Sequence, residues 1–310
     1  MPLAAFGILG CGGHPLGGGR DAGPPRFTPP VTLAEVSSAW NLTADAVNLY
    51  WATTEGDPNA DLVGIPQAGG APFMVGRDTG FFTFMVSDDG WIYGTDLDLV
   101  SRLATRGGDR EAVAHAGLCY VGTVTPSAVW CGFGQGLTRV DREAGTTARV
   151  GESLGYVAVA LAVDDVRAYW TAGGALLEVD QSGGPTRTLL DGNAAGGPWP
   201  VLIGLDDRSL YVATTEAIVR VDKATGAAAP LRRGLVNGLA VRKGMIFWSE
   251  PDTARVGATP AAGGPDIVIA EGETTLQALV ASDAGVFWLS EVSRSAERSL
   301  VRGSYFVVGP

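Results

Sequence analysis

Few residues in this sequence have the types and spacing that catalysis or metal binding requires. Residues 151–155, GESLG, match the G-x-S-x-G nucleophile pattern, in which a sharp turn from a strand into a helix exposes the serine. Ser153 falls instead between two expected strands, with no helix after it. His115 could act as its base only from a neighbouring loop. A chance match explains the motif better, so we predict no catalytic residue.

Metal ligands are also scarce. The chain has two histidines, His14 and His115, and His14 precedes the expected folded domain, which excludes a site built from several histidines. The cysteines are better explained in another way, so zinc is disfavoured as well. We predict no cofactor, with one Ca²⁺ or another divalent ion as the alternative.

One short segment has part of a calcium-loop pattern. Residues 57–61, DPNAD, place Asp57, Asn59 and Asp61 at the alternating spacing of such a loop. The loop should have glycine at its sixth position and glutamate at its twelfth, but Leu62 and Ala68 stand there. A solvated hairpin loop is therefore the better prediction.

The elements that must position any site are repeated along the chain. Segments with a hydrophobic residue, an aromatic residue and then small residues recur, anchored at Tyr50, Tyr93, Trp130, Tyr169, Tyr211, Phe247 and Phe287. Consecutive anchors are 43, 37, 39, 42, 36 and 40 residues apart. Repeats of this length are typical of β-propeller blades.

Turn residues recur in phase with these anchors. Glycines, which adopt a positive φ without steric cost, end one turn of each of the first six repeats at Gly70, Gly108, Gly145, Gly184, Gly226 and Gly264; the last repeat lacks this glycine. Aspartates, whose side chains can bond the turn backbone, open another turn at Asp45, Asp88, Asp164, Asp206 and Asp283. Two markers in phase support the repeat more strongly than one.

The repeat around Tyr169 contains four strand-like segments. They are the apolar residues 157–163, the aromatic 167–171, the alternating 175–180 and the short 186–190. We predict an all-β fold, a seven-bladed β-propeller of four-stranded antiparallel blades, with six or eight blades or a β-sandwich as alternatives. The last repeat lacks an outer strand, which residues 27–36 could supply to close the ring.

These segments also resemble a known repeat. YWAT, YWTA, FWSE and FWLS look like the YWTD-type propeller repeats of the low-density-lipoprotein receptor class and its bacterial relatives, across residues 36–310. The resemblance implies the propeller fold. It transfers no receptor ligand, because the terminal aspartate of the motif is absent from every copy and because the receptor modules have one blade fewer.

Propeller topology divides the connections between two faces. The phased turns lie on one face, whereas loops between second and third strands and between blades lie on the other and are irregular, as functional loops often are. Our candidate ligand-face residues there are Glu55, Asp57, Phe81, Asp96, Tyr156, Trp199, Glu250, Asp252, Glu291 and Arg294. Trp199 either anchors a partner or, more simply, caps the core between two blades.

The N-terminal residues indicate export. Residues 1–11 end in ILGC and resemble a truncated lipoprotein signal segment with Cys11 as the lipidated residue; an incidental cysteine in a disordered start is the alternative. Residues 12–27 are rich in Gly and Pro and indicate a tether, and residues 28–310 form the predicted propeller domain. We expect an exported protein, lipid-anchored in the bacterial envelope.

The two remaining cysteines form an even pair in an oxidising compartment. Cys119 and Cys131 fall in adjacent predicted strands, and they would face each other if the hairpin register centres near Thr125. We therefore predict a possible disulfide. A shifted register would leave two buried thiols instead.

Charge narrows the classes of partner. The chain has 22 basic and 33 acidic residues, a net charge of −11, which opposes nucleic-acid phosphates and anionic lipid headgroups. We predict a non-enzymatic monomeric module that binds a protein, peptide or glycan of the cell envelope. The alternative is a lactonase-like hydrolase with a divalent ion in the central channel, held by oxygens of Asp96, Asn237 and Glu250.

Overall fold

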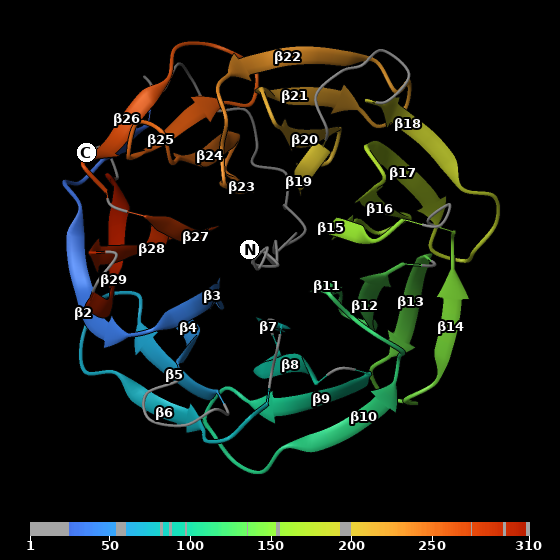
Figure 1. The fold of residues 1–310 in the computed structure, drawn as a ribbon, viewed down its shortest axis with the longest axis horizontal. Helices are drawn as coiled ribbons and strands as arrows, with labels where there is room; N and C mark the ends of the chain where they lie inside the picture. The colour runs from blue at the N-terminus through green and yellow to red at the C-terminus, as the bar shows by residue number, and fades with distance from the viewer. Residues whose placement is uncertain are drawn as a thin grey trace.

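The strands of this protein are arranged in blades around a central axis (Figure 1). A computed structural model describes residues 25–53, 60–80, 83–86, 89–96, 98–134, 136–152, 156–192, 200–273, 275–293 and 296–307. Those ranges contain strands and turns but no helix, and so none that is long and apolar enough to cross a membrane. Seven antiparallel sheets make up the blades, so the protein is a seven-bladed β-propeller, as the repeat spacing predicts.

Strands follow one another within each blade, from the innermost to the outermost. Blades 1 to 3 contain β3 (Ala39–Ala44), β4 (Asn48–Thr53), β5 (Asp61–Pro66), β6 (Phe73–Gly76); β7 (Thr83–Val86), β8 (Trp91–Asp96), β9 (Leu99–Ala104), β10 (Glu111–His115); and β11 (Val121–Val124), β12 (Ala128–Phe133), β13 (Gly136–Asp141), β14 (Thr147–Val150). Blades 4 to 6 contain β15 (Ala158–Val163), β16 (Arg167–Ala172), β17 (Ala175–Asp180), β18 (Arg187–Asp191); β19 (Pro200–Leu205), β20 (Ser209–Thr214), β21 (Ala217–Asp222), β22 (Ala228–Arg233); and β23 (Gly238–Arg242), β24 (Met245–Glu250), β25 (Arg255–Pro260), β26 (Ile267–Glu271). Blade 7 contains β27 (Leu276–Ala281), β28 (Gly285–Ser293) and β29 (Ala296–Val307).

The N-terminal strands close the ring. β1 (Arg26–Phe27) and β2 (Val31–Ser37) both pair antiparallel with β29, so β2 is the outermost strand of blade 7. Figure 1 shows this blue strand beside the red strands of the chain's end. The predicted closure is confirmed, and pairing begins at Arg26, two residues before the boundary expected from composition.

Aromatic residues of the second strands form the interfaces between blades. In β16, Tyr169 shares a buried cluster with Val212 of blade 5, whereas the next residue, Trp170, shares one with Trp130 of blade 3. The alternation arises because successive side chains of a strand point to opposite faces. Each interface between blades has one such cluster, which explains why an aromatic pair recurs at this position in the sequence.

The aspartates that open the first turn also hold these tyrosines. Asp206 Oδ1 accepts hydrogen bonds from the backbone N–H groups of Arg208 (2.9 Å) and Ser209 (2.8 Å), and Asp206 Oδ2 accepts one from the Tyr211 hydroxyl (2.6 Å). Asp45 with Tyr50 and Asp164 with Tyr169 repeat this pattern. All six phased glycines have a positive φ, as predicted: Gly70, Gly108, Gly145, Gly184, Gly226 and Gly264.

Blade 7 departs from the predicted turn. Ser282 holds the position that aspartate holds in blades 1, 4 and 5, and its Oγ accepts a hydrogen bond from the Ala284 N–H (3.1 Å). Asp283 lies one residue later and forms an ion pair with Arg242 (2.9 Å). Asp88 lies outside the described residues.

Charged side chains tie neighbouring blades together at these turns. Lys223 Nζ donates to Asp164 Oδ2 (2.8 Å) across the interface and to the Asp206 carbonyl (2.5 Å) in its own blade. Burial acts to raise the pKa of Asp164, but the hydrogen bond from Lys223 and two backbone N–H groups lower it below its usual range. Arg142 makes a similar tie from blade 3 to blade 2, donating to the Tyr93 hydroxyl (2.8 Å).

Candidate interaction surface

The connections lie on two faces with different chemistry. Turns such as residues 164–167 and 180–184 join first to second and third to fourth strands, and we call their side the Asp-turn face. Segments such as residues 116–120 and 173–174 join blades or second to third strands, and we call their side the loop face. The candidate ligand-face residues that the structure describes belong to the loop face by this topology: Asp96, Tyr156, Glu250, Asp252 and Glu291.

Five apolar side chains are exposed on the loop face near the central axis. We call them the axial surface: Leu118, Tyr120, Tyr156, Val157 and Val159. Four precede the innermost strands β11 and β15, and Val159 lies at a bulge within β15. Apolar groups gathered on an otherwise polar exterior mark surfaces that contact other molecules.

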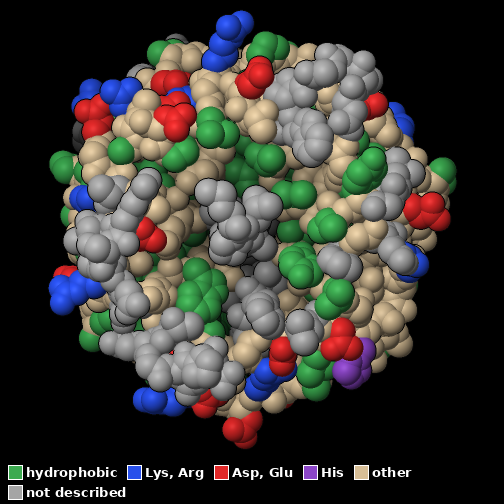
Figure 2. Space-filling model, viewed as in Figure 1, with side chains coloured by type: hydrophobic (Ala, Val, Ile, Leu, Met, Phe, Trp, Pro, Cys, Tyr) green, Lys and Arg blue, Asp and Glu red, His purple; other side chains and the backbone are tan. Residues whose placement is uncertain are grey.

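Contacts at Gly132 show that the two halves of the axial surface are neighbours. A Cβ at Gly132 would lie 2.8 Å from Val121 Cγ2 and 2.9 Å from Ala158 Cβ, so the first residues of β11 and β15 are adjacent. Tyr120 and Val157 immediately precede those two residues. Figure 2 shows hydrophobic side chains gathered near the centre of the face, over the positions of β11 and β15 in Figure 1.

Tyr156 lies against the turn between β16 and β17. A Cβ at Gly173 would come within 2.3 to 2.8 Å of three Tyr156 ring atoms, so the ring occupies space that any other residue would fill. The φ of Gly173 is +57°, which also favours glycine. The turn therefore supports one side of the Tyr156 ring while 58% of the residue stays exposed.

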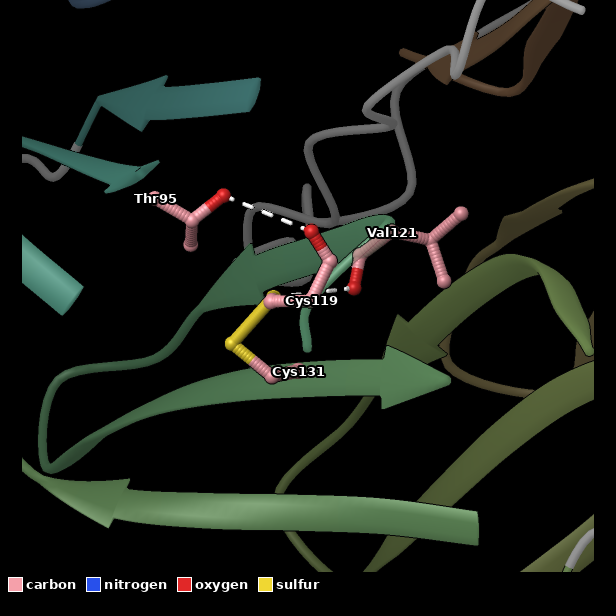
Figure 3. Close-up of a disulfide and its surroundings, with 4 residues drawn as sticks. All are labelled: Thr95, Cys119, Val121 and Cys131. Carbon is pink, nitrogen blue, oxygen red and sulfur yellow. Dashed lines mark hydrogen bonds between the residues drawn. A yellow bond between two sulfur atoms is a disulfide. The ribbon is translucent and has the colours of Figure 1, made fainter. Parts of the chain in front are cut away.

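A disulfide joins Cys119 to Cys131 with a Cα–Cα distance of 5.0 Å. Figure 3 shows the bond, with Thr95 Oγ1 donating to the Cys119 carbonyl (3.4 Å). The register differs from the predicted one, because Gly122 rather than Cys119 is the ladder partner of Cys131. Cys119 precedes the strand, and its side chain reaches Cys131 from outside the ladder.

The predicted polar residues are engaged in separate local contacts. Asp96 pairs with Arg110 (3.4 Å) in blade 2, and Glu250 pairs with Arg232 (2.8 Å) at the interface of blades 5 and 6. Burial acts to raise the pKa of Glu250, but hydrogen bonds from Thr253 and Arg232 lower it. These carboxylates are therefore held by partners of their own blades or interfaces.

Two further polar residues on this face lie in blades 6 and 7. Asp252 is exposed in the β24–β25 turn. Glu291 accepts a hydrogen bond from Gln277 (2.5 Å). The remaining residues of the prediction lie outside the described residues: Cys11, Glu55, Asp57, Phe81, Trp199 and Arg294.

The described residues form no metal-ligand cluster. No group of three or more His, Cys, Asp or Glu side chains that could hold a metal ion occurs among them. Asn237 donates to the Leu276 carbonyl (2.6 Å) and accepts from Ser249 Oγ (2.7 Å), so its amide is used within the fold. His115 pairs with Asp98 (3.0 Å) at the surface.

Sequence reasoning found one residue of the axial surface, Tyr156, and missed the other four. Apolar residues in or next to a predicted strand are normally assigned to the core, and Val157 falls in the apolar segment 157–163 that we predicted as an innermost strand. A usable signal exists in the segment AGLCY, where Leu118 and Tyr120 flank a cysteine in a connection between blades.

Comparison with known proteins establishes the fold class. No family model matches the chain, and no curated protein matches it at a significant level. Among solved structures, BamB from Moraxella catarrhalis matches with a TM-score of 0.58 and 15% identity, over 90% of this chain and 100% of that one. The Pan2 WD40 domain of Neurospora crassa gives 0.67 and 11%, over 88% and 95%. A Mycobacterium tuberculosis puromycin-hydrolyzing peptidase gives 0.67 and 14%, over 85% of this chain and 50% of that chain. At these identities the likeness shows the β-propeller fold alone.

Proposed function

We propose that this protein is a non-enzymatic interaction module that binds a polypeptide through the axial surface. The observation that carries the proposal is the exposure of five apolar side chains, two of them tyrosines, at adjacent inner strands on one face. Tyrosine is enriched at protein interfaces because its ring supplies apolar contact area and its hydroxyl a hydrogen bond.

The support beneath these side chains favours a docking role. Gly173 lies against the Tyr156 ring, and Cys119, which lies between Leu118 and Tyr120 in the chain, is joined by a disulfide to Cys131 of β12. Side chains that are already held in place lose little conformational entropy when a partner binds. A surface of this kind is ready to bind without rearrangement.

We further propose a lipid anchor at Cys11, which would orient this surface. β1 pairs Arg26 with Val307, at the end of β29 that lies on the Asp-turn face. A tether that leaves there would set the Asp-turn face toward the membrane and the loop face toward the envelope space. Metabolic labelling with an alkyne fatty acid should modify the wild-type chain and not a Cys11→Ser variant; equal labelling would rule out this anchor.

Site-specific photo-cross-linking tests the proposed surface. A photoreactive phenylalanine analogue is placed at Tyr156 on the loop face or at Val166 on the Asp-turn face, since both residues are 58% exposed. In the native host, the analogue at position 156 should yield a discrete protein adduct that Tyr120→Ala weakens, and position 166 should yield none. Equal adducts at both positions, or an adduct unaffected by Tyr120→Ala, would refute the proposal.

A further inference from the structure

We propose that Cys119 and Cys131 are a positioning pair for the axial surface. Their disulfide fixes residues 116–120 so that Leu118 and Tyr120 project from the loop face. This inference rests on the proposed function of that surface. It assigns to the disulfide a role in partner binding that is separate from its contribution to overall stability.

The exposure pattern shows how the disulfide orients this segment. Leu118 is 44% exposed, Cys119 5% and Tyr120 54%, so the bonded residue points inward between two side chains that point outward. Turning the segment about its own axis would move Cys119 outward and the other two inward. The covalent bond to β12 prevents that rotation.

Backbone contacts place the segment outside the regular sheet. β11 begins at Val121, after the cysteine. Hydrogen bonds tie the ends of the segment, from the Ala116 N–H to the Asp98 carbonyl (2.8 Å) and from the Tyr120 N–H to the Gly132 carbonyl (3.1 Å). The disulfide adds a covalent tie between these two points.

The position of Cys131 explains why a cross-link can be accommodated here. Cys131 follows the anchor Trp130, as Trp170 follows Tyr169 in blade 4, and it lies in the cluster between blades 2 and 3 with Tyr93. Its ladder partner, Gly122, has no side chain. A small residue opposite a glycine leaves room that the Cys119 side chain fills, so the loop segment becomes part of the packing between two blades.

The test compares a full-length Cys119→Ser/Cys131→Ser variant with Lys223→Met, a control destabilised on the Asp-turn face. Both are studied at a temperature where far-ultraviolet circular dichroism shows them fully folded. The probe is a fluorescein-labelled short peptide, selected from a random library on the wild-type chain with counter-selection on Tyr156→Ala. Amide hydrogen exchange is followed in residues 116–120 and in β16 as an internal reference.

The double-serine variant should bind the peptide about tenfold more weakly, and exchange in residues 116–120 should rise about tenfold, with β16 unchanged. Lys223→Met should leave both readouts at the wild-type value. Peptide binding that depends on Tyr120 but tolerates loss of the disulfide would overturn the inference and leave the surface intact. Selection of no peptide that depends on Tyr120 or Tyr156 would overturn the proposed surface, and the inference with it.

Discussion

The two faces of this propeller differ in the types of side chain that they carry. On the Asp-turn face, aspartates hold backbone N–H groups and tyrosine hydroxyls, and cations such as Lys223 and Arg142 tie one blade to the next. On the loop face, the apolar side chains of the axial surface are exposed to solvent. Gly173 lies against one of them, Tyr156, and a disulfide holds the segment that carries two others, Leu118 and Tyr120. The difference teaches that the Asp-turn face carries mainly contacts that tie blades together. The loop face has such contacts too, as between Arg232 and Glu250, but also presents apolar side chains to solvent.

The cross-blade ties extend around much of the Asp-turn face. Besides Lys223 and Arg142, Lys243 Nζ donates to the Asp283 carbonyl (2.6 Å) from blade 6 to blade 7. Ser282 Oγ donates to Gln67 Oε1 (2.7 Å) from blade 7 to blade 1. Substitutions on this face should therefore act on stability, and those on the axial surface on binding.

Ring closure should give the largest effect on the framework. Deleting residues 25–37 removes β1 and β2 and leaves one edge of β29 unpaired. We expect a loss comparable to the whole stability of a domain, about 5–15 kcal/mol, so the chain should lose its cooperative thermal transition. Deleting residues 1–24 alone should leave that transition in place. A folded chain without residues 25–37 would show that closure is dispensable.

Two arginines sharpen the comparison next, Arg142 with its partners on the Asp-turn face and Arg110 with its partner Asp96 on the loop face. Arg142 is buried, with its side chain 7% exposed, and it pairs with Asp89 and bonds the Thr125 carbonyl (3.0 Å). Arg142→Met should cost about 2–4 kcal/mol, because the buried Tyr93 hydroxyl and the part-buried Thr125 carbonyl lose their donor. Arg110→Met breaks a more exposed pair with Asp96 and a hydrogen bond to the Thr79 carbonyl (2.6 Å), and should cost about 1–2 kcal/mol, less than Arg142→Met. Urea unfolding measures the free energy of unfolding of both variants. Equal losses would contradict the expected difference between the two arginines.

Alkaline pH should weaken the Asp-turn face selectively. Burial, together with the neighbouring aspartate, raises the pKa of Tyr50, Tyr169 and Tyr211 well above its ordinary value. A raised folded-state pKa gives stability that is present below the unfolded pKa near 10 and is lost as pH rises beyond it. Each tyrosine should contribute no more than about 1 kcal/mol of loss between about pH 10 and 11.

The stability loss is measured as the change in melting temperature between about pH 8 and about pH 11. Tyr211→Phe should lower the melting temperature at neutral pH and reduce the alkaline loss. Phenylalanine already occupies this position in blades 6 and 7, at Phe247 and Phe287, so the ring itself is compatible with the fold. An alkaline loss of the same size in the variant would point to other groups.

A pair of glycine substitutions separates a small stability effect from an effect on binding. Gly173 (φ +57°) and Gly244 (φ +69°) share a left-handed backbone, and Gly244 has no atom near the site of a Cβ. Alanine at either position should cost about 1 kcal/mol. Only Gly173→Ala should displace the Tyr156 ring and reduce the cross-link at position 156. Equal cross-linking in both variants would mean that the turn does not position Tyr156.

The repeated features were open to prediction from sequence because each serves the same purpose several times. Tyr169, Trp170 and Asp164 recur in similar form wherever blades must pack and turns must close, so phase and period identify them. The hairpin register of blade 3 also follows the repeat, because Val124 pairs with Val129 just before the anchor as Val163 pairs with Ala168 in blade 4. The approach of Cys119 to Cys131 from outside the ladder has no counterpart in blade 4 and could not be found from the repeat. Leu118 and Val157 were missed because composition alone does not tell an exposed apolar residue from a buried one.

The meeting of the chain's two ends in blade 7 has a mechanical consequence. If the N-terminal segment is anchored and a partner binds the loop face, as proposed, a pull between the two runs along the axis of β1 and β2. Their hydrogen bonds to β29 lie perpendicular to that axis, so the load falls on them in shear. Hydrogen bonds loaded in shear must break together rather than one after another. The pairing of β1 and β2 with β29, which closes the ring, would therefore also carry this force.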